Sequence, residues 1–342
     1  ILDGKNISRG FEDASSGTKD GMVIINDGTL TLGSPTQTGG TVTGGYVSVT
    51  GFAGGVNVGL GNSSAKLTNY ITISSNKSAT AGGVYVAYGS VFDNYGRIEY
   101  NTGNLYGGGV NCNGTFTNYS TGVIANNKAR NGGGIIIGSN SVATNYGVIS
   151  NNTATNNGGG VDVNGYTSLF INGGTINNNR AEYSGGGISN GGSNDGYGVK
   201  LLDNTVITGN TAANYGGGVC GTGYLSMSGK VIITDNKRGS VNSTVTDNLK
   251  VYMSPNSPRY SKLIKLEGAL LEGSLIGVNG TEGPSDSTCA AGVITQGYQT
   301  GVPSGALKYF IKDGIQDKSK GYVLIVNQSN ELEFVEHSHS WT

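Results

Sequence analysis

Apolar residues recur along this chain with a near-constant step between residues 73 and 236. Each copy holds an isoleucine, an asparagine three residues later, and a glycine run closed by valine or isoleucine. The steps between successive isoleucines are 25, 26, 25, 27, 31 and 26 residues. The isoleucines are Ile73, Ile98, Ile124, Ile149, Ile176, Ile207 and Ile233. A fixed step of roughly 20 to 50 residues is typical of proteins built from stacked repeats.

Within each copy, apolar residues alternate with polar ones over short runs, as in Val161-Asp162-Val163, and glycine or asparagine bounds each run. This pattern predicts short strands and turns, and glycine and asparagine are poor helix formers. A copy is long enough for three short strands and three turns, which is one coil of a parallel β-helix with coils about 4.8 Å apart. We therefore predict an all-β chain, a right-handed parallel β-helix (solenoid) of about nine coils with a β-rich C-terminal cap.

The asparagine of each copy has a structural role in this arrangement. Asparagine tolerates left-handed backbone angles at turns, and its amide can bond its own backbone. Stacked coil over coil, each amide can also donate to one neighbour and accept from the other. The glycine runs suit corners with positive φ or closely approaching backbones. The predicted structural turn column consists of Asn76, Asn101, Asn127, Asn152, Asn179, Asn210 and Asn236.

The repeat pattern also divides the chain. Residues 1–55 are predicted to form the N-terminal coils of the β-helix, and residues 56–236 its regular repeat coils. The glycine runs stop after residue 236, so residues 237–335 are predicted to be an irregular β-rich extension and cap, with a hairpin around residues 327–330. Residues 336–342 are predicted to be a linker to a following domain.

Composition narrows the class of partner. The 342 residues include 62 glycines, and 21 basic residues against 22 acidic ones give a net charge of −1. Such a balance does not favour nucleic acid or an anionic membrane as the main partner. The chain has no apolar run of the roughly 18 residues that a membrane helix needs, so membrane insertion is not expected.

Catalytic chemistry has little support in the sequence. Glycoside hydrolysis uses two carboxylates on one face, about 5 to 9.5 Å apart. Asp93 and Asp203 occupy equivalent positions but lie four coils apart, and outward-facing Asp162 has Ile136 and Ser189 as its predicted neighbours. We therefore expect no catalytic residue, although a polysaccharide lyase or glycoside hydrolase remains the alternative.

Metal and cofactor sites are not expected either. His337 and His339 form a His-x-His pair without the further ligands that a metal site needs. Cys112 and Cys220 lie about four coils apart, which exceeds the roughly 7 Å between Cα atoms that a disulfide allows.

One aromatic feature exceeds what composition explains. Tyr70, Tyr95, Tyr119 and Tyr146 each follow an asparagine at the same place in four successive copies. In a β-helix they would form a column of rings about 4.8 Å apart. This column either rigidifies one corner or offers a platform for sugar rings or a protein partner. A second patch is predicted from the tyrosines just before glycine runs, which are Tyr106, Tyr183 and Tyr215.

Three groups of segments resemble the large repeat-containing surface proteins of gut Firmicutes. The repeated phrase is seen at residues 147–154 (Gly-Val-Ile-Ser-Asn-Asn-Thr-Ala) with Gly-Gly-Gly-Val at residues 158–161, and it is shared with β-helices of the pectate-lyase-like and polymorphic outer-membrane groups. The other segments that carry the resemblance are residues 27–32, 248–253, 268–270, 276–278, 293–298, 308–310 and 337–342.

The resemblance implies an exported protein with an extracellular, cell-surface or cell-wall location, and it implies no defined activity. The leading hypothesis is a non-catalytic surface module, acting as an adhesin or a stiff stalk, that contacts a host glycan or a host surface protein. We expect the sequence to be a piece of a longer multidomain chain.

Overall fold

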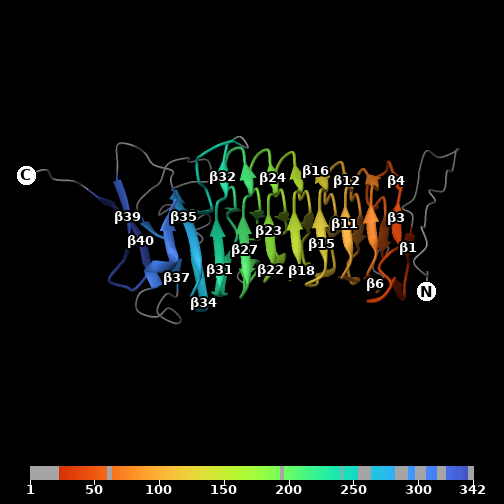
Figure 1. Cartoon of the computed structure of the whole chain (residues 1–342), viewed down its shortest axis with the longest axis horizontal. Coiled ribbons are helices and arrows are strands. Elements are labelled where there is room, and N and C mark those ends of the chain that lie inside the picture. The colour runs from red at the N-terminus through yellow and green to blue at the C-terminus, as the bar shows by residue number, and fades with distance from the viewer. Residues whose placement is uncertain are drawn as a thin grey trace, which may run out of the picture.

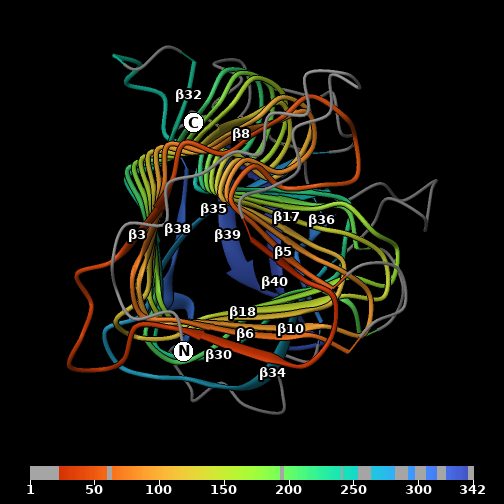
Figure 2. The same cartoon turned by 90° about the vertical axis from the view of Figure 1, so that its right-hand side faces the viewer.

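The computed structural model describes residues 23–59, 64–192, 196–239, 242–252, 263–281, 292–296, 306–313 and 321–337. The described chain is a solenoid of parallel β-coils stacked along its long axis (Figure 1). The predicted fold class is therefore confirmed. Seen down the axis, each coil passes through four groups of strands, labelled by β5 and β17, by β6 and β10, by β3, and by β8 (Figure 2).

The strands that follow the glycine runs form one group, which we call the valine stack. Each pairs in parallel and in register with its counterparts in the neighbouring coils. Its members are β1 (Val23–Ile25), β5 (Val56–Val58), β9 (Val84–Val86), β13 (Val110–Cys112), β17 (Ile135–Ile137), β21 (Val161–Val163), β25 (Ile188–Asn190), β29 (Val219–Gly221) and β33 (Leu249–Tyr252).

The second group, which we call the phenylalanine sheet, is a ten-stranded parallel sheet. The rings of Phe92 and Phe116 lie in its adjacent coils with their centroids 5.0 Å apart. Its members are β2 (Thr29–Leu32), β6 (Lys66–Asn69), β10 (Val91–Asn94), β14 (Thr115–Asn118), β18 (Val142–Asn145), β22 (Leu169–Asn172), β26 (Gly198–Leu201), β30 (Leu225–Gly229), β34 (Ile264–Leu270) and β37 (Thr295–Gln296).

The third group, the isoleucine stack, carries the repeated isoleucines. Ile73, Ile98 and Ile124 are register partners in successive strands and are fully buried. Burying such a side chain stabilises the fold by about 1.5–3 kcal/mol. Its members are β3 (Thr41–Thr43), β7 (Thr72–Ser74), β11 (Arg97–Glu99), β15 (Val123–Ala125), β19 (Val148–Ser150), β23 (Thr175–Asn177), β27 (Thr205–Thr208), β31 (Val231–Thr234), β35 (Leu275–Thr281) and β38 (Phe310–Lys312).

A fourth group, the short-strand sheet, adds a fourth strand to each coil, whereas the sequence predicts three. It has one two-residue strand in each of eight coils, whereas the sequence predicts about nine coils. Its members are β4 (Tyr46–Val47), β8 (Lys77–Ser78), β12 (Thr102–Gly103), β16 (Lys128–Ala129), β20 (Thr153–Ala154), β24 (Arg180–Ala181), β28 (Thr211–Ala212) and β32 (Lys237–Arg238).

The coils continue past the predicted boundary at residue 236. Strands β33, β34 and β35 pair in parallel with the stacks before them, so the predicted extension is part of the same solenoid. The end is covered by β36 (Gly292–Val293), β39 (Gly321–Val326) and β40 (Leu332–His337). A short 3-10 helix, η2 (Ala306–Tyr309), comes directly before β38 in the chain. Strands β39 and β40 form the predicted antiparallel hairpin, and Leu332 and Phe334 are fully buried in the core.

The predicted linker at residues 336–342 begins inside β40, and residues 338–342 lie outside the described residues. Residues 1–22 of the predicted N-terminal coils lie outside them as well. Across the described ranges, no helix combines the length and the apolar character needed to cross a membrane.

The seven asparagines of the turn column form a continuous hydrogen-bonded ladder. The Oδ1 of Asn101 accepts hydrogen bonds from both the backbone N–H and the Nδ2 of Asn76, each at 3.0 Å. The Nδ2 of Asn101 in turn donates to the Oδ1 of Asn127 and to the carbonyl of Ile73. The same pattern links every later pair as far as Asn236.

The left-handed residue of this turn is not the ladder asparagine, which corrects the expectation that asparagine is chosen for its backbone angle. Positive φ falls one residue earlier, at 55–58° for Ser75, Tyr100, Asn126, Asn151, Asn178 and Asp235. The ladder asparagine is therefore required for its amide, which satisfies buried donors and acceptors in two neighbouring coils.

The glycine runs meet both predicted requirements at different positions. The first glycine has positive φ, for example 63° at Gly132. The second and third lie against the next coil, because a Cβ at Gly133 would approach the Gly159 carbonyl oxygen to 2.5 Å. Side chains are thus excluded from this corner.

The ladder ends on a carboxylate near the C-terminal cap. Asn248 follows Asn236 and accepts its two hydrogen bonds. The backbone N–H and Nδ2 of Asn248 then donate to the two oxygens of Asp313, each at 2.6 Å. Burial raises the pKa of Asp313 to about 7, and the donors from Asn248 oppose that rise.

Replacing one ladder amide should destabilise the fold. Asn127→Ala leaves two donors of Asn101 without an acceptor, so we expect the free energy of unfolding to fall by roughly 3 kcal/mol. Chemical denaturation followed by circular dichroism measures this. Asn104, exposed in the coil before, supplies the control variant Asn104→Ala. Equal stability of the two variants would contradict the role of the ladder.

The carboxyl at the ladder's end should make stability depend on pH. Asp313 keeps its proton up to about pH 7 when folded. It ionises near pH 4 when unfolded, so the free energy of unfolding should fall as pH rises between these values. The slope is at most about 1.4 kcal/mol per pH unit for one proton. Asp313→Asn should flatten it, Asp235→Asn should not, and the same slope in both would refute the assignment.

Candidate functional site

Two hollows lie along the outer side of the valine stack. The first has a volume of about 480 Å³ and the second about 430 Å³. Asn164 lines both, so they are consecutive parts of one groove parallel to the solenoid axis. The groove begins near Thr50 and reaches Thr222.

The floor of the groove is the middle residue of each valine-stack strand. These residues are register partners in six successive coils, so the floor extends over about 24 Å. They point away from the core, as their position between two inward residues predicts, yet several are almost completely buried. The floor residues are Tyr85, Asn111, Ile136, Asp162, Ser189 and Cys220.

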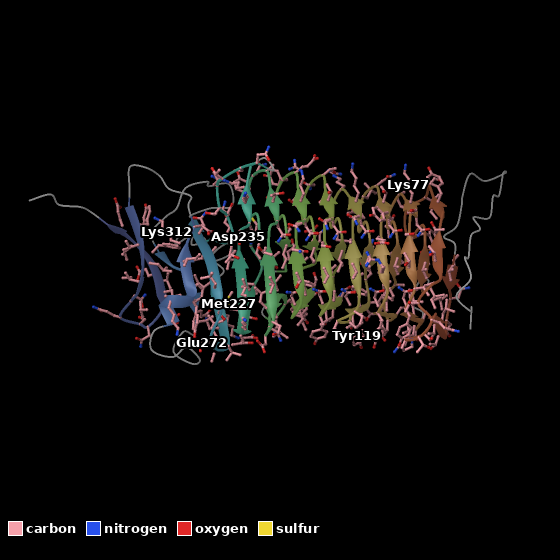
Figure 3. All side chains as sticks on the ribbon, viewed as in Figure 1. Lys77, Tyr119, Met227, Asp235, Glu272 and Lys312 are labelled. Atoms are coloured by element: carbon pink, nitrogen blue, oxygen red, sulfur yellow. The ribbon has the colours of Figure 1, made fainter. Side chains whose placement is uncertain are left out.

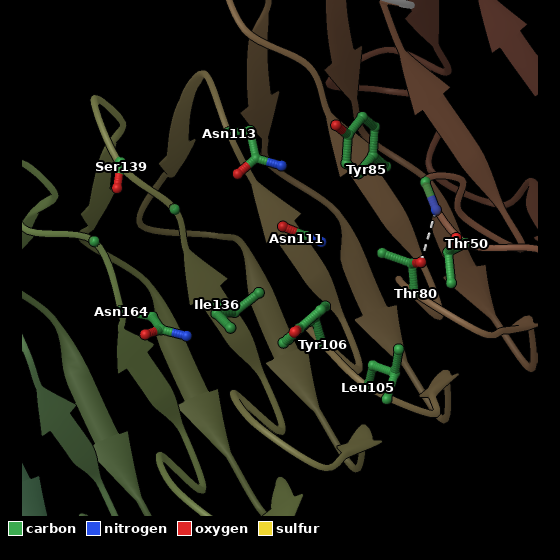
Figure 4. A pocket seen from close by; sticks show the side chains of 13 residues that line it. Thr50, Thr80, Tyr85, Leu105, Tyr106, Asn111, Asn113, Ile136, Ser139 and Asn164 are labelled. Carbon is green, nitrogen blue, oxygen red and sulfur yellow. Dashed lines mark hydrogen bonds between the residues drawn. The ribbon is translucent and has the colours of Figure 1, made fainter.

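The walls are the turns on either side of the valine stack (Figure 4). Leu105 and Tyr106 come from the turn that leads from the short-strand sheet into this stack. Asn113, Ser139 and Asn164 come from the turns that lead out of it toward the phenylalanine sheet. The groove therefore combines aromatic, aliphatic, amide and hydroxyl groups.

Asp162 is the one acidic residue among the described residues that line the groove, and no lysine or arginine is among them. Its side chain is 5% exposed, and this burial raises its pKa to about 6, while a hydrogen bond with Ser189 opposes the rise. Ile136 and Ser189 are its register neighbours, as the sequence predicts. Asp162 thus lacks a second carboxylate within the groove lining.

The predicted tyrosine column lies at a different corner, where the phenylalanine sheet turns into the isoleucine stack. Tyr70 and Tyr95 stack with centroids 4.9 Å apart, and Tyr95 and Tyr119 stack at 4.2 Å. Both faces of the Tyr95 ring are therefore covered by neighbouring rings. Burial and a hydrogen bond with Tyr119 raise the pKa of Tyr95 to about 12.

Tyr146 differs from the three stacked tyrosines. Two extra residues, Ser120 and Thr121, follow Tyr119 in the chain, and Tyr146 is 47% exposed. A Cβ on Gly173, which takes the tyrosine position in the next coil, would lie 3.3 Å from the Tyr146 ring. The absence of a side chain at Gly173 leaves this face of the ring uncovered by a fifth aromatic residue.

A second asparagine ladder supports the tyrosines, and sequence reasoning missed it. Each asparagine that precedes a column tyrosine donates its Nδ2 to the Oδ1 of the next at 2.8 Å, from Asn69 through Asn94 and Asn118 to Asn145 and Asn172. The sequence feature that could have revealed this ladder is the asparagine directly before each column tyrosine, but only the tyrosines were assigned a role.

The structure does not bring the tyrosine column and the groove together. Within a coil, the column follows the phenylalanine sheet, whereas the groove lies over the valine stack. In Figure 3, Tyr119 of the tyrosine column and Lys77 of the short-strand sheet lie at opposite edges of the solenoid.

The other singled-out residues separate in the same way. Tyr106 and Tyr183, predicted as a second patch, line the groove, and Tyr183 meets Tyr215 edge-on at 6.0 Å. Asp93 pairs with Lys66 at 2.9 Å, and its register counterpart four coils on is Lys200, so the predicted equivalence of Asp93 and Asp203 is wrong. Cys112 and Cys220 are both buried, the first in the core and the second in the groove floor, and no disulfide joins them.

The groove as a whole was not predicted from the sequence. Its floor is the outward-facing residue of each strand that follows a glycine run. The residue type at that position changes from coil to coil, so no repeated pattern marks the groove. No family model, curated protein or solved structure matches this chain.

The stacked tyrosines should contribute to stability where Tyr146 does not. Aromatic pairs are worth about 0.5–1.5 kcal/mol each, so Tyr95→Ala should lower the free energy of unfolding by roughly 1–3 kcal/mol. Tyr146→Ala is the matched control and should have a smaller effect. Chemical denaturation of both variants checks this, and a larger effect at Tyr146 would contradict it.

Proposed function

We propose that this chain is a non-catalytic, exported surface module in which a stiff solenoid presents its groove to an extended, neutral glycan. It acts as an adhesin or a binding stalk. The observation that carries the proposal is the groove of six coils, lined by tyrosines, amides and hydroxyls, with Asp162 as the one ionisable carboxyl among its described residues.

The chemistry of the groove suits sugar units. Asn111, Asn113 and Asn164 offer donors and acceptors for hydroxyl groups. Tyr85 and Tyr106 offer ring faces and phenolic hydroxyls, which bind surfaces that are apolar on one side and polar on the other. The absence of basic residues from the described lining favours a neutral glycan over an acidic one.

The tyrosine column is less suited to stacking with a sugar. A sugar ring would pack on an aromatic face, and Tyr95 has a tyrosine against each face. Tyr146 is the most exposed member and is the place where a partner protein would contact this column.

The proposed location follows from the resemblance to repeat-containing surface proteins of gut Firmicutes. A parallel β-solenoid is consistent with that group, in which such chains are exported and associated with the cell wall. A host glycan or a host surface protein is then the expected partner.

A polysaccharide lyase or glycoside hydrolase is the second candidate, and Asp162 is the observation that favours it. Its pKa of about 6 would suit a proton donor near neutral pH. A glycoside hydrolase, however, uses a second carboxylate. Release of reducing or unsaturated sugar ends that stops in Asp162→Asn would replace the binding proposal with this one.

A binding screen tests the proposed function. The purified chain is presented to soluble neutral and acidic polysaccharides, and the affinity for any bound glycan is measured by calorimetry. We expect a neutral glycan to bind and Tyr106→Ala to weaken it about tenfold or more, which corresponds to about 1.4 kcal/mol.

The control separates the two aromatic surfaces. Tyr146→Ala, at the opposite corner, should leave glycan affinity unchanged. Failure of every neutral glycan to bind would overturn the proposal. Loss of binding in Tyr146→Ala alone would assign the site to the tyrosine column.

A further inference from the structure

The row of outward-facing residues that forms the groove floor continues past the end of the groove, and its next member is a buried lysine. Lys250 lies on β33 between inward Leu249 and Val251, and it therefore points to the outer side of the stack. Only 3% of Lys250 is exposed, and its Nζ lies 4.0 Å from the centroid of the Tyr215 ring. Lysine is almost never buried to this degree unless other groups accompany it, so the surroundings of Lys250 need an explanation.

A buried asparagine lies next to this lysine. Asn279 on β35 is the register partner of Lys250 in the parallel pairing of β33 with β35. Partners in neighbouring strands lie about 4.8 Å apart and send their side chains to the same face. Asn279 is 2% exposed, and its Nδ2 has no hydrogen-bond partner in the described part of the chain. The lysine amine and the asparagine amide are thus within reach of each other.

A carboxyl group completes the cluster. Asp247 is fully buried, and its Oδ2 accepts a hydrogen bond of 2.8 Å from the backbone N–H of Gly216. Its Oδ1 has no partner among the described residues. Asp247 precedes Lys250 by only three residues, and burial raises the pKa of this carboxyl while the charge of Lys250 and the side chain of Asn279 oppose the rise.

We infer that Lys250 and Asn279 are joined by an intramolecular amide bond between the lysine Nζ and the asparagine Cγ, with Asp247 as the group that moves the protons. Two buried polar side chains are then joined covalently beside a third, which gives a reason for burying together three groups that would each be costly to bury alone. The inference is independent of glycan binding.

The reaction needs no other reactant. The ammonium group of Lys250 passes a proton to the Asp247 carboxylate, and the neutral Nζ attacks Cγ of Asn279. The Nζ–Cγ bond forms and the Cγ–Nδ2 bond breaks, while Asp247 delivers a proton to the departing nitrogen and takes one from Nζ. Ammonia leaves, and the sum is lysine plus carboxamide giving a secondary amide plus ammonia.

The bond would join two consecutive coils where the regular repeats end. Strand β33 pairs with β29 on one side and β35 on the other, and β35 also pairs with β31. A covalent link at this point prevents the last coils from peeling away, as other cross-links do by limiting the unfolded chain.

Mass spectrometry tests the inference. The intact mass of the purified, folded 342-residue chain, measured under denaturing conditions, should be lower than the sequence mass by one ammonia. Tryptic digestion should yield one branched peptide that joins Lys250 to Asn279. A folded chain with the full sequence mass would overturn the inference, and loss of water would place the bond on Asp247 instead and overturn it as well.

The variants separate the cross-link from a cyclic imide. Asn279 precedes Gly280, and an Asn-Gly pair can also lose ammonia by closing on its own backbone. Lys250→Arg should restore the full mass if the lysine is the nucleophile, and persistence of the ammonia loss in that variant would overturn the inference.

Two further variants complete the test. Asp247→Asn should restore the full mass with its circular dichroism spectrum retained, and an unchanged ammonia loss would remove Asp247 from the reaction. Lys265→Arg, on the neighbouring phenylalanine sheet, is the matched control and should keep the loss. The thermal midpoint should be lower in Lys250→Arg than in this control.

Discussion

In-register stacking of asparagine amides is the constraint on which the rest of the solenoid depends. Each ladder amide accepts from the coil before it and donates to the coil after it, so no buried coil is satisfied alone. The backbone angle of the turn is supplied by the preceding residue, which frees the asparagine to serve neighbouring coils. The glycine corner lies directly against this ladder, because a Cβ at Gly83 would come within 3.0 Å of the Asn101 Nδ2 and within 2.5 Å of the next backbone.

Most of the fold could be predicted because the repeat converts sequence distance into spatial position. The spacing of Ile73, Ile98 and Ile124 fixed which residues lie over one another, and the register pairs agree. The short-strand sheet was missed because two residues are too few for an alternation pattern. The stacking goes on beyond residue 236 in strands β33 to β35, and the sequence could not specify their register because the glycine runs stop there.

The site was less predictable for a physical reason. Core positions repeat their residue types, whereas the groove floor changes from Tyr85 to Asn111 to Ile136, so no periodic signal marks it. The tyrosine column did repeat and was visible, but its regularity reflects rings that pack against each other. The lysine cluster at Lys250 depends on pairing between strands that no repeat relates. Repetition therefore identified the scaffold, and departures from repetition carry the candidate chemistry.

The hydrogen bonds from one ladder amide to the next all run the same way, which makes the column of amides an electric dipole along the solenoid axis. Its carbonyl end faces the first coils, where the Asn76 oxygen meets the Gly45 backbone N–H. Its N–H end faces the cap, and there the acceptor is the carboxyl of Asp313. An acidic group beside the positive end of aligned amides is the arrangement found at the start of an α-helix. The β-solenoid thus reproduces the electrostatics of an α-helix end in its asparagine side chains.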